Sequence, residues 1–155
     1  MHLTNIPTIL SSLTFLLPFY ASVDTRNVIS AFGWGALTTT SLFLHITKKP
    51  VHIYGHGNCI PILEQIDLGM VYAIIIRSQI DGYYAGPIGL FVSMGVVVWG
   101  TIVFHIGRMM GMFVYDPRAD ISILSHVSLH LLASFGGAGV IYLRALKNGL
   151  EKSTV

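Results

Sequence analysis

Five apolar runs, separated by short polar segments, divide most of this chain. A membrane-spanning helix needs about 20 largely apolar residues, and each run approaches or exceeds that length. Asp24-Thr25-Arg26-Asn27 and Lys48-Lys49-Pro50 separate the first three runs, and Arg77-Ser78-Gln79-Ile80-Asp81 is expected to form the next polar connection. The pattern predicts an all-α integral membrane protein, one domain built as a bundle of about five transmembrane helices. The expected spans cover residues 6–23, 28–46, 60–76, 84–110 and 120–146.

Composition supports a membrane environment. Of the 155 residues, 53% are hydrophobic and only 10% are charged, whereas a soluble domain carries roughly 25% charged residues. The formal net charge is +2 and no basic run is present, so we expect no nucleic-acid partner. We predict a multi-pass protein whose partners are membrane lipids. The mitochondrial inner membrane and an endomembrane both remain open as its location.

Two segments leave the helix count open. The first apolar run resembles a signal peptide, but no Lys or Arg precedes it, so we interpret it as a first membrane helix. The stretch from Gly86 to Tyr115 is long enough for one helix or for two shorter ones.

The last apolar run carries a polar stripe. Ser122, His126, His130 and Ser134 are each four residues apart, so they share one face of a helix. Ionisable side chains inside a membrane helix are costly, and they usually mark a functional site. Two neutral imidazoles one turn apart can both reach one metal ion. The stripe therefore predicts a metal site facing the interior of the bundle.

Two other runs supply partners for this pair. Ser41 and His45 lie in the second run, and Asp67 lies in the third. If these faces converge, His45, His126 and His130 form a three-histidine zinc site with an open fourth position for water. An open position is typical of catalytic zinc. Asp67 and Ser41 would then stand beside it as candidate catalytic residues.

The same segments resemble the CREST superfamily. Ser41-Leu42-Phe43-Leu44-His45, Leu63-Glu64-Gln65-Ile66-Asp67 and His126-Val127-Ser128-Leu129-His130 are similar to its S-x-x-x-H, Asp and H-x-x-x-H motifs, in the same order. The superfamily includes the alkaline ceramidases, the adiponectin and progestin receptors, proteins that remodel GPI anchors, and the myomaker proteins. The segment from Asp81 to Gly89 also resembles the myomaker branch.

The resemblance implies a shortened version of a seven-helix core, because about two helices are missing between Asp67 and His126. It implies zinc held by His45, His126 and His130, with Asp67 as the general base and Ser41 stabilising the oxyanion. In ceramidase-type members this chemistry cleaves a lipid amide. The acidic N-terminal segment of the alkaline ceramidases is absent here, since Met1–Val23 contains no carboxylate.

Two other functions fit the same residues. The chain is small enough to be a non-catalytic accessory subunit of a larger membrane complex, such as a mitochondrial energy-transducing complex, with other membrane subunits as partners. It is also compatible with a small b-type cytochrome, in which His45 and either His126 or His130 would be axial ligands.

Overall fold

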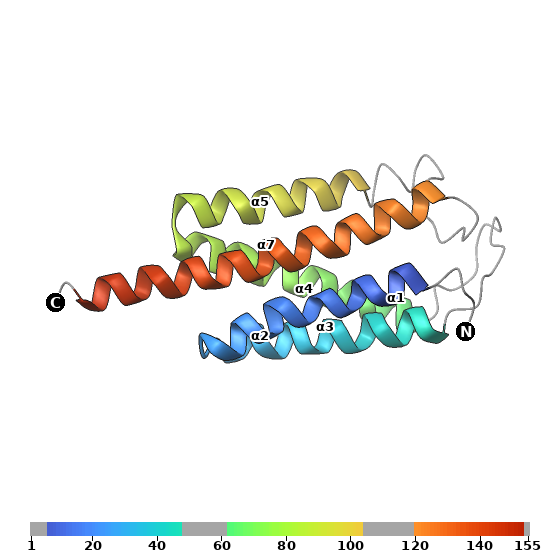
Figure 1. Cartoon of the computed structure of the whole chain (residues 1–155), viewed down its shortest axis with the longest axis horizontal. Coiled ribbons are helices and arrows are strands. Elements are labelled where there is room, and N and C mark those ends of the chain that lie inside the picture. Colours follow the sequence, from blue (N-terminus) through green and yellow to red (C-terminus); the bar gives the residue numbers. More distant parts are fainter. Residues whose placement is uncertain (1–5, 48–61, 104–119, 154–155) are drawn as a thin grey trace.

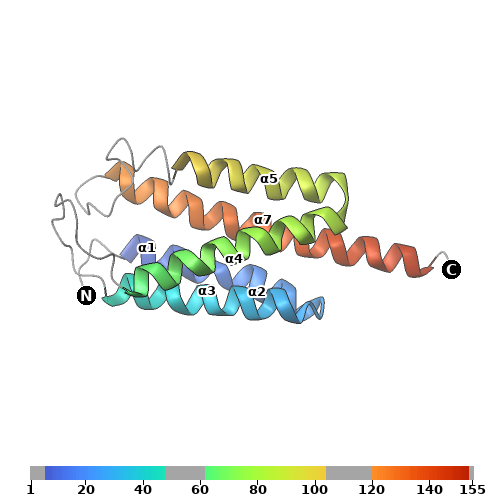
Figure 2. The same ribbon diagram turned by 180° about the vertical axis from the view of Figure 1, so that it is seen from behind.

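A computed structural model describes residues 6–47, 62–103 and 120–153, and it is all-helical there, with no strand among those residues. The helices run roughly along the long axis of an elongated bundle (Figure 1). α7 (Asp120–Ser153) contacts α1, α2, α4 and α5 and so occupies the centre of the bundle. Seen from behind, α4 lies across the face opposite to that of Figure 1 (Figure 2). The last turns of α7 extend past the other helices.

The first apolar run forms a rod of three short helical pieces. α1 (Ile6–Ser12) and α2 (Leu16–Asp24) are joined by a 3-10 turn, η2 (Leu13–Phe15). Pro18 lacks the N–H that would bond to the Thr14 carbonyl, and Thr14 lies within the tighter turn. This rod agrees closely with the expected helix over residues 6–23.

A short turn joins α2 to α3 (Val28–Thr47). The Asn27 N–H bonds to the Ser22 carbonyl at 2.7 Å and closes the end of α2. The Asn27 side chain accepts a hydrogen bond of 3.3 Å from the Ser30 N–H, which is the usual role of asparagine at a helix N-terminus. α3 therefore begins where the apolar run predicted.

The expected polar connection at residues 77–81 is wrong. α4 runs from Ile62 to Ala85 without interruption, so Arg77 and Asp81 lie one turn apart on the same helix. The charged pair did not end the helix because both side chains find partners inside the bundle. α4 is consequently longer than the helix expected over residues 60–76.

The next helix begins later than residue 84. Gly86 has a φ of 93°, a left-handed conformation that favours glycine, and it separates α4 from α5 (Pro87–Thr101). Pro87 then occupies the first position of α5, where its missing N–H costs nothing. Residues 104–119 lie outside the described part of the chain. Whether one helix or two form between Gly86 and Tyr115 therefore stays open.

Two helical segments, Ile6–Asp24 and His126–Leu150, are long and apolar enough to cross a membrane. α5 is a shorter apolar helix. The number of crossings expected from the sequence stays a prediction.

A small apolar core holds α2, α3, α4 and α7 together. Its buried members are Phe15, Ala21, Trp34, Leu37, Ile74 and Ile141. The Trp34 ring packs directly on α7 at Gly137, where an added Cβ would lie 2.5 Å from Cζ2 of the ring. A side chain at this glycine would therefore push α3 away from α7.

We expect Gly137→Ala to lower the free energy of unfolding by about 1–3 kcal/mol, the usual cost of overpacking a core. Gly139→Ala is the matched control on the same helix, because nothing lies within 4 Å of its Cβ position. The control gains up to about 1 kcal/mol of helix propensity. Thermal unfolding of the two variants in detergent measures the difference. Equal stabilities would contradict the close approach of Trp34.

Candidate metal centre

Three histidines from two helices meet near one end of the bundle. His45 lies in the last turn of α3, and His126 and His130 lie near the start of the described part of α7. The His126 and His130 ring centroids are 4.4 Å apart, and the His45 ring lies 4.8 Å from His126 and 5.5 Å from His130. The spacing of four residues therefore placed the α7 pair on one face, as predicted.

The three imidazoles can hold a metal ion. One ligand atom from each lies within 4.8 Å of the other two. Three nitrogens bound to one tetrahedral ion at about 2.0–2.1 Å would be about 3.4 Å apart, so a small inward movement of the rings completes the site. His45 and His130 are only 3% and 6% exposed, and His126 is partly buried. The expectation of a metal-binding histidine cluster is confirmed to this extent, whereas the identity of the metal stays a prediction.

Two serines of the first rod contact His130, and neither was predicted from the sequence. Ser11 Oγ lies 2.9 Å and Ser12 Oγ 3.5 Å from Nδ1 of His130. Each hydroxyl donates its own proton to the Thr8 carbonyl, at 3.0 and 2.8 Å. Their oxygens are therefore acceptors toward the ring, which makes Nδ1 the protonated nitrogen. This tautomer leaves the lone pair of Nε2 for a metal.

A signal for these serines was present in the sequence. Thr8, Ser11 and Ser12 are spaced by three and four residues in an apolar run, which places three hydroxyl groups on one face. This is the same kind of polar stripe that identified His126 and His130. A polar face on a second apolar helix should have been matched to the first.

Ser41 belongs to the same hydrogen-bonded group. Its hydroxyl is buried and lies 3.1 Å from Ser12 Oγ, so Ser12 connects Ser41 to the ring of His130. Because Ser12 donates to Thr8, Ser41 is the donor to Ser12. The structure thus brings Ser41 close to the histidines, as the sequence predicted.

Asp67 is linked to the site only through α3. Its Oδ1 accepts a hydrogen bond of 3.1 Å from Thr40, the residue that precedes Ser41 on α3. Asp67 is not a member of the group whose ligand atoms all lie within 4.8 Å of one another. Its assignment as a general base stays a prediction.

Ser134 stabilises the same turn of α7. Its hydroxyl donates to the His130 carbonyl at 2.7 Å and lies 2.7 Å from Thr14 Oγ1. Phe15 packs against the His130 ring, with centroids 4.8 Å apart. Contacts from the first rod therefore hold His130 on two sides, which fixes the ring before any ion binds.

The chain matches no protein-family model, and comparisons with curated proteins and with solved structures found no match. The resemblance to the CREST superfamily therefore stays a prediction.

Proposed function

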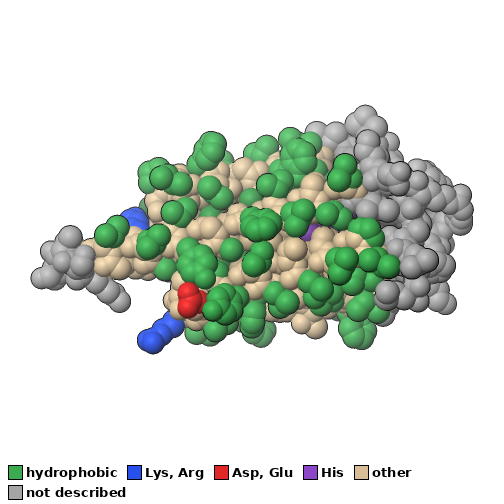
Figure 3. Space-filling view, in the orientation of Figure 1, with side chains coloured by type: hydrophobic (Ala, Val, Ile, Leu, Met, Phe, Trp, Pro, Cys, Tyr) green, Lys and Arg blue, Asp and Glu red, His purple; other side chains and the backbone are tan. Residues whose placement is uncertain are grey.

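We propose that this chain is a multi-pass membrane protein with an intramembrane zinc site of the CREST type. The distribution of side chains supports the membrane environment. Buried positions include seven serines, two histidines and an aspartate, whereas Phe32 and Phe91 are 78% and 81% exposed. Hydrophobic side chains cover the visible face of the bundle, and few charged groups appear on it (Figure 3). Such a surface is unfavourable in water and favourable in lipid, where polar groups must be satisfied internally.

The observation that carries the zinc proposal is the group of three imidazoles within 4.8 Å of one another. Nitrogen donors suit zinc, and three protein ligands leave the fourth position of a tetrahedral site open. His45 and His126 pack edge to face with ring centroids 4.8 Å apart. Axial haem ligands lie on opposite faces of a porphyrin, so two rings in direct contact leave no room for haem between them, and a single metal ion fits better.

The reaction we propose is hydrolysis of a lipid amide, as the resemblance implies. Zinc, when bound, supplies a Lewis acid that polarises a carbonyl and activates water at neutral pH. Asp67 would accept the proton of the attacking water and pass it to the leaving amine. Ser41 would turn its hydroxyl from Ser12 to the oxygen of the tetrahedral intermediate.

Elemental analysis of the purified full-length protein tests the metal site. We expect about one zinc per chain, no Soret absorption, and loss of most of the zinc in His126→Ala. Leu131→Ala is the control, because this residue lies on α7 beside His130 with its side chain partly exposed. Unchanged zinc content in His126→Ala would refute the ligand assignment.

Ser11→Ala should weaken zinc binding without removing a ligand. Loss of the hydrogen bond that orients a metal-bound histidine usually reduces affinity about 10–100-fold. A competition titration with a chromogenic chelator measures the effect. Thr39→Ala is the control, because among the described residues the Thr39 hydroxyl donates only to the Gly35 carbonyl of its own helix. Equal affinities for both variants would show that Ser11 does not position His130.

The hydrolase proposal has its own test. Zinc-loaded protein is incubated with labelled ceramide, and release of the fatty acid is compared with that of Asp67→Asn. We expect release by the unaltered chain and a loss of about 100-fold or more in the variant. No release by the zinc-loaded chain would refute the enzymatic activity.

A non-catalytic subunit of a membrane complex is the second candidate. The end of α7 that extends past the bundle favours it (Figure 1), and Leu150, three residues before the end of this helix, is 68% exposed. Native gel electrophoresis of mildly solubilised membranes tests it. Migration as a single chain of 17.0 kDa would exclude a stable complex.

A further inference from the structure

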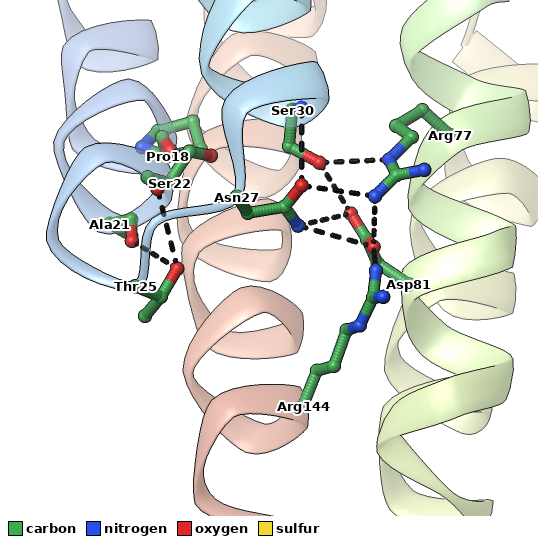
Figure 4. Close-up of polar contacts among 9 residues, drawn as sticks. All are labelled: Pro18, Ala21, Ser22, Thr25, Asn27, Ser30, Arg77, Asp81 and Arg144. Atoms are coloured by element: carbon green, nitrogen blue, oxygen red, sulfur yellow. Dashed lines mark hydrogen bonds and ion pairs between the residues drawn. The ribbon is translucent and has the colours of Figure 1, made fainter. Parts of the chain in front are cut away.

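A second polar cluster joins the start of α3 to α4 and α7 (Figure 4). It lies at the opposite end of α3 from His45. Its centre is Asp81 on α4, whose side chain is 2% exposed. Arg77 Nη2 donates to Asp81 Oδ1 at 2.9 Å, and Arg144 Nη1 of α7 donates to the same oxygen. Ser30 Oγ donates to Oδ2 at 2.7 Å, and Asn27 Nδ2 contacts both oxygens at 3.3 and 3.4 Å. We call these five residues the Asp81 cluster.

The Asp81 cluster contains more positive than negative charge. It holds two guanidinium groups and one carboxylate, which leaves a charge of +1. In residues 6–47, 62–103 and 120–153, both ion pairs of these arginines end on Asp81. A cation that is partly removed from water without a counter-ion is costly. The cluster therefore has the charge to attract an anion.

Of the two arginines, Arg144 is the one with free hydrogen-bond donors for an anion from outside the cluster. Arg77 uses Nε on Ser30 at 2.9 Å and Nη2 on Asn27 and Asp81, so most of its fork is occupied. Within the described part of the chain, Arg144 uses Nη1 for Asp81, which leaves Nε and Nη2 for other acceptors. Its side chain is 27% exposed, compared with 19% for Arg77.

The surroundings of Arg144 suit a lipid headgroup. Its guanidinium lies over the Tyr84 ring, 5.0 Å from the centroid. Tyr83 and Tyr84 are 70% and 52% exposed at the end of α4, and Ile88 in the first turn of α5 is 69% exposed. Exposed tyrosines followed by apolar side chains are typical of the boundary between headgroups and acyl chains.

We propose that Arg144, held by Asp81 and Tyr84, binds a phosphate group at this end of the bundle. Guanidinium forks bind phosphate through paired hydrogen bonds, and basic pockets between membrane helices bind anionic headgroups. The phosphate belongs to an anionic phospholipid or is free in solution. This site is independent of zinc, because the His45, His126 and His130 cluster lies toward the other ends of α3 and α7.

Thermal unfolding of the full chain tests the site. Micelles containing phosphatidylglycerol are compared with micelles of phosphatidylcholine, and inorganic phosphate is compared with chloride at equal ionic strength. We expect phosphatidylglycerol or phosphate to raise Tm by about 3 °C or more. The shift should disappear in Arg144→Gln, which leaves Arg77 and Asp81 as a balanced pair, and persist in Lys147→Gln, a cation three residues further along α7.

The two arms identify the source of the phosphate. A shift with phosphatidylglycerol alone assigns a lipid headgroup, and a shift with inorganic phosphate assigns the free ion. No shift in either arm refutes the proposal, and so does an equal loss in Arg144→Gln and Lys147→Gln. If Arg144→Gln does not fold, native mass spectrometry of the unaltered chain with equimolar phosphatidylglycerol and phosphatidylcholine decides. Preferential retention of phosphatidylglycerol supports a lipid headgroup, and retention of added inorganic phosphate supports the free ion. Equal retention of the two lipids with no retained phosphate overturns the proposal.

Discussion

Asp81→Asn should lower the free energy of unfolding by about 3–5 kcal/mol, the usual cost of removing one partner from a buried ion pair. Asp81 is 1% exposed and is the common partner of Arg77, Arg144, Ser30 and Asn27. Without its charge, two guanidinium groups would remain inside the bundle near each other. At about 2–4 °C per kcal/mol for a chain of this size, Tm should fall by roughly 6 °C or more.

Two further variants show whether charge causes this loss. Asp24→Asn removes an exposed carboxylate at the end of α2 and should change Tm by only about 1–2 °C. Asp81→Asn combined with Arg144→Gln removes the carboxylate together with one cation, so the double variant should be more stable than Asp81→Asn alone. If the second change adds its own destabilisation instead, Asp81 acts through hydrogen bonding and not through charge.

Zinc should stabilise the unaltered chain strongly and should have little effect on His130→Ala. A ligand present at about 100 times its Kd adds about 2.7 kcal/mol, which corresponds to roughly 5–10 °C in Tm. A strong chelator should reverse the shift. Leu131→Ala keeps all three imidazoles and should respond to zinc as the unaltered chain does. An equal response of His130→Ala would place the bound zinc elsewhere.

Acidification should abolish the effect of zinc. A protonated imidazole has no lone pair for a metal, so protons and zinc compete for the three histidines. The difference in Tm with and without zinc should therefore be large at pH 8 and small at pH 5. A zinc effect that persists at pH 5 would point to ligands other than imidazole.

The sequence predicted the parts of the metal site that depend on local spacing. Four residues between His126 and His130 place both rings on one face of any helix, and the uncharged run around them marked that face as internal. Ser11 and Ser12 share a recognisable polar face of the first run, but their contact with His130 spans 119 and 118 residues of sequence and depends on tertiary packing. The partner of a polar stripe depends on how the helices pack, which spacing alone does not determine.

The Asp81 cluster was missed for a different reason. Arg77 and Asp81 are four residues apart, which is the spacing of a helical ion pair, yet their charges indicated the end of a membrane run. Tertiary contacts with Asn27, Ser30 and Arg144 make the charges compatible with a continuous helix. The one-residue break at Gly86, by contrast, has a local signal, because Pro87 follows the glycine directly.

That break also bears on the proposed membrane topology. Gly86 is the single residue between α4 and α5, so in the proposed multi-pass arrangement the two helices would enter the bilayer together as a hairpin. Any epitope or reporter spliced into this corner would separate the two arms, so topology mapping has to place its tags elsewhere.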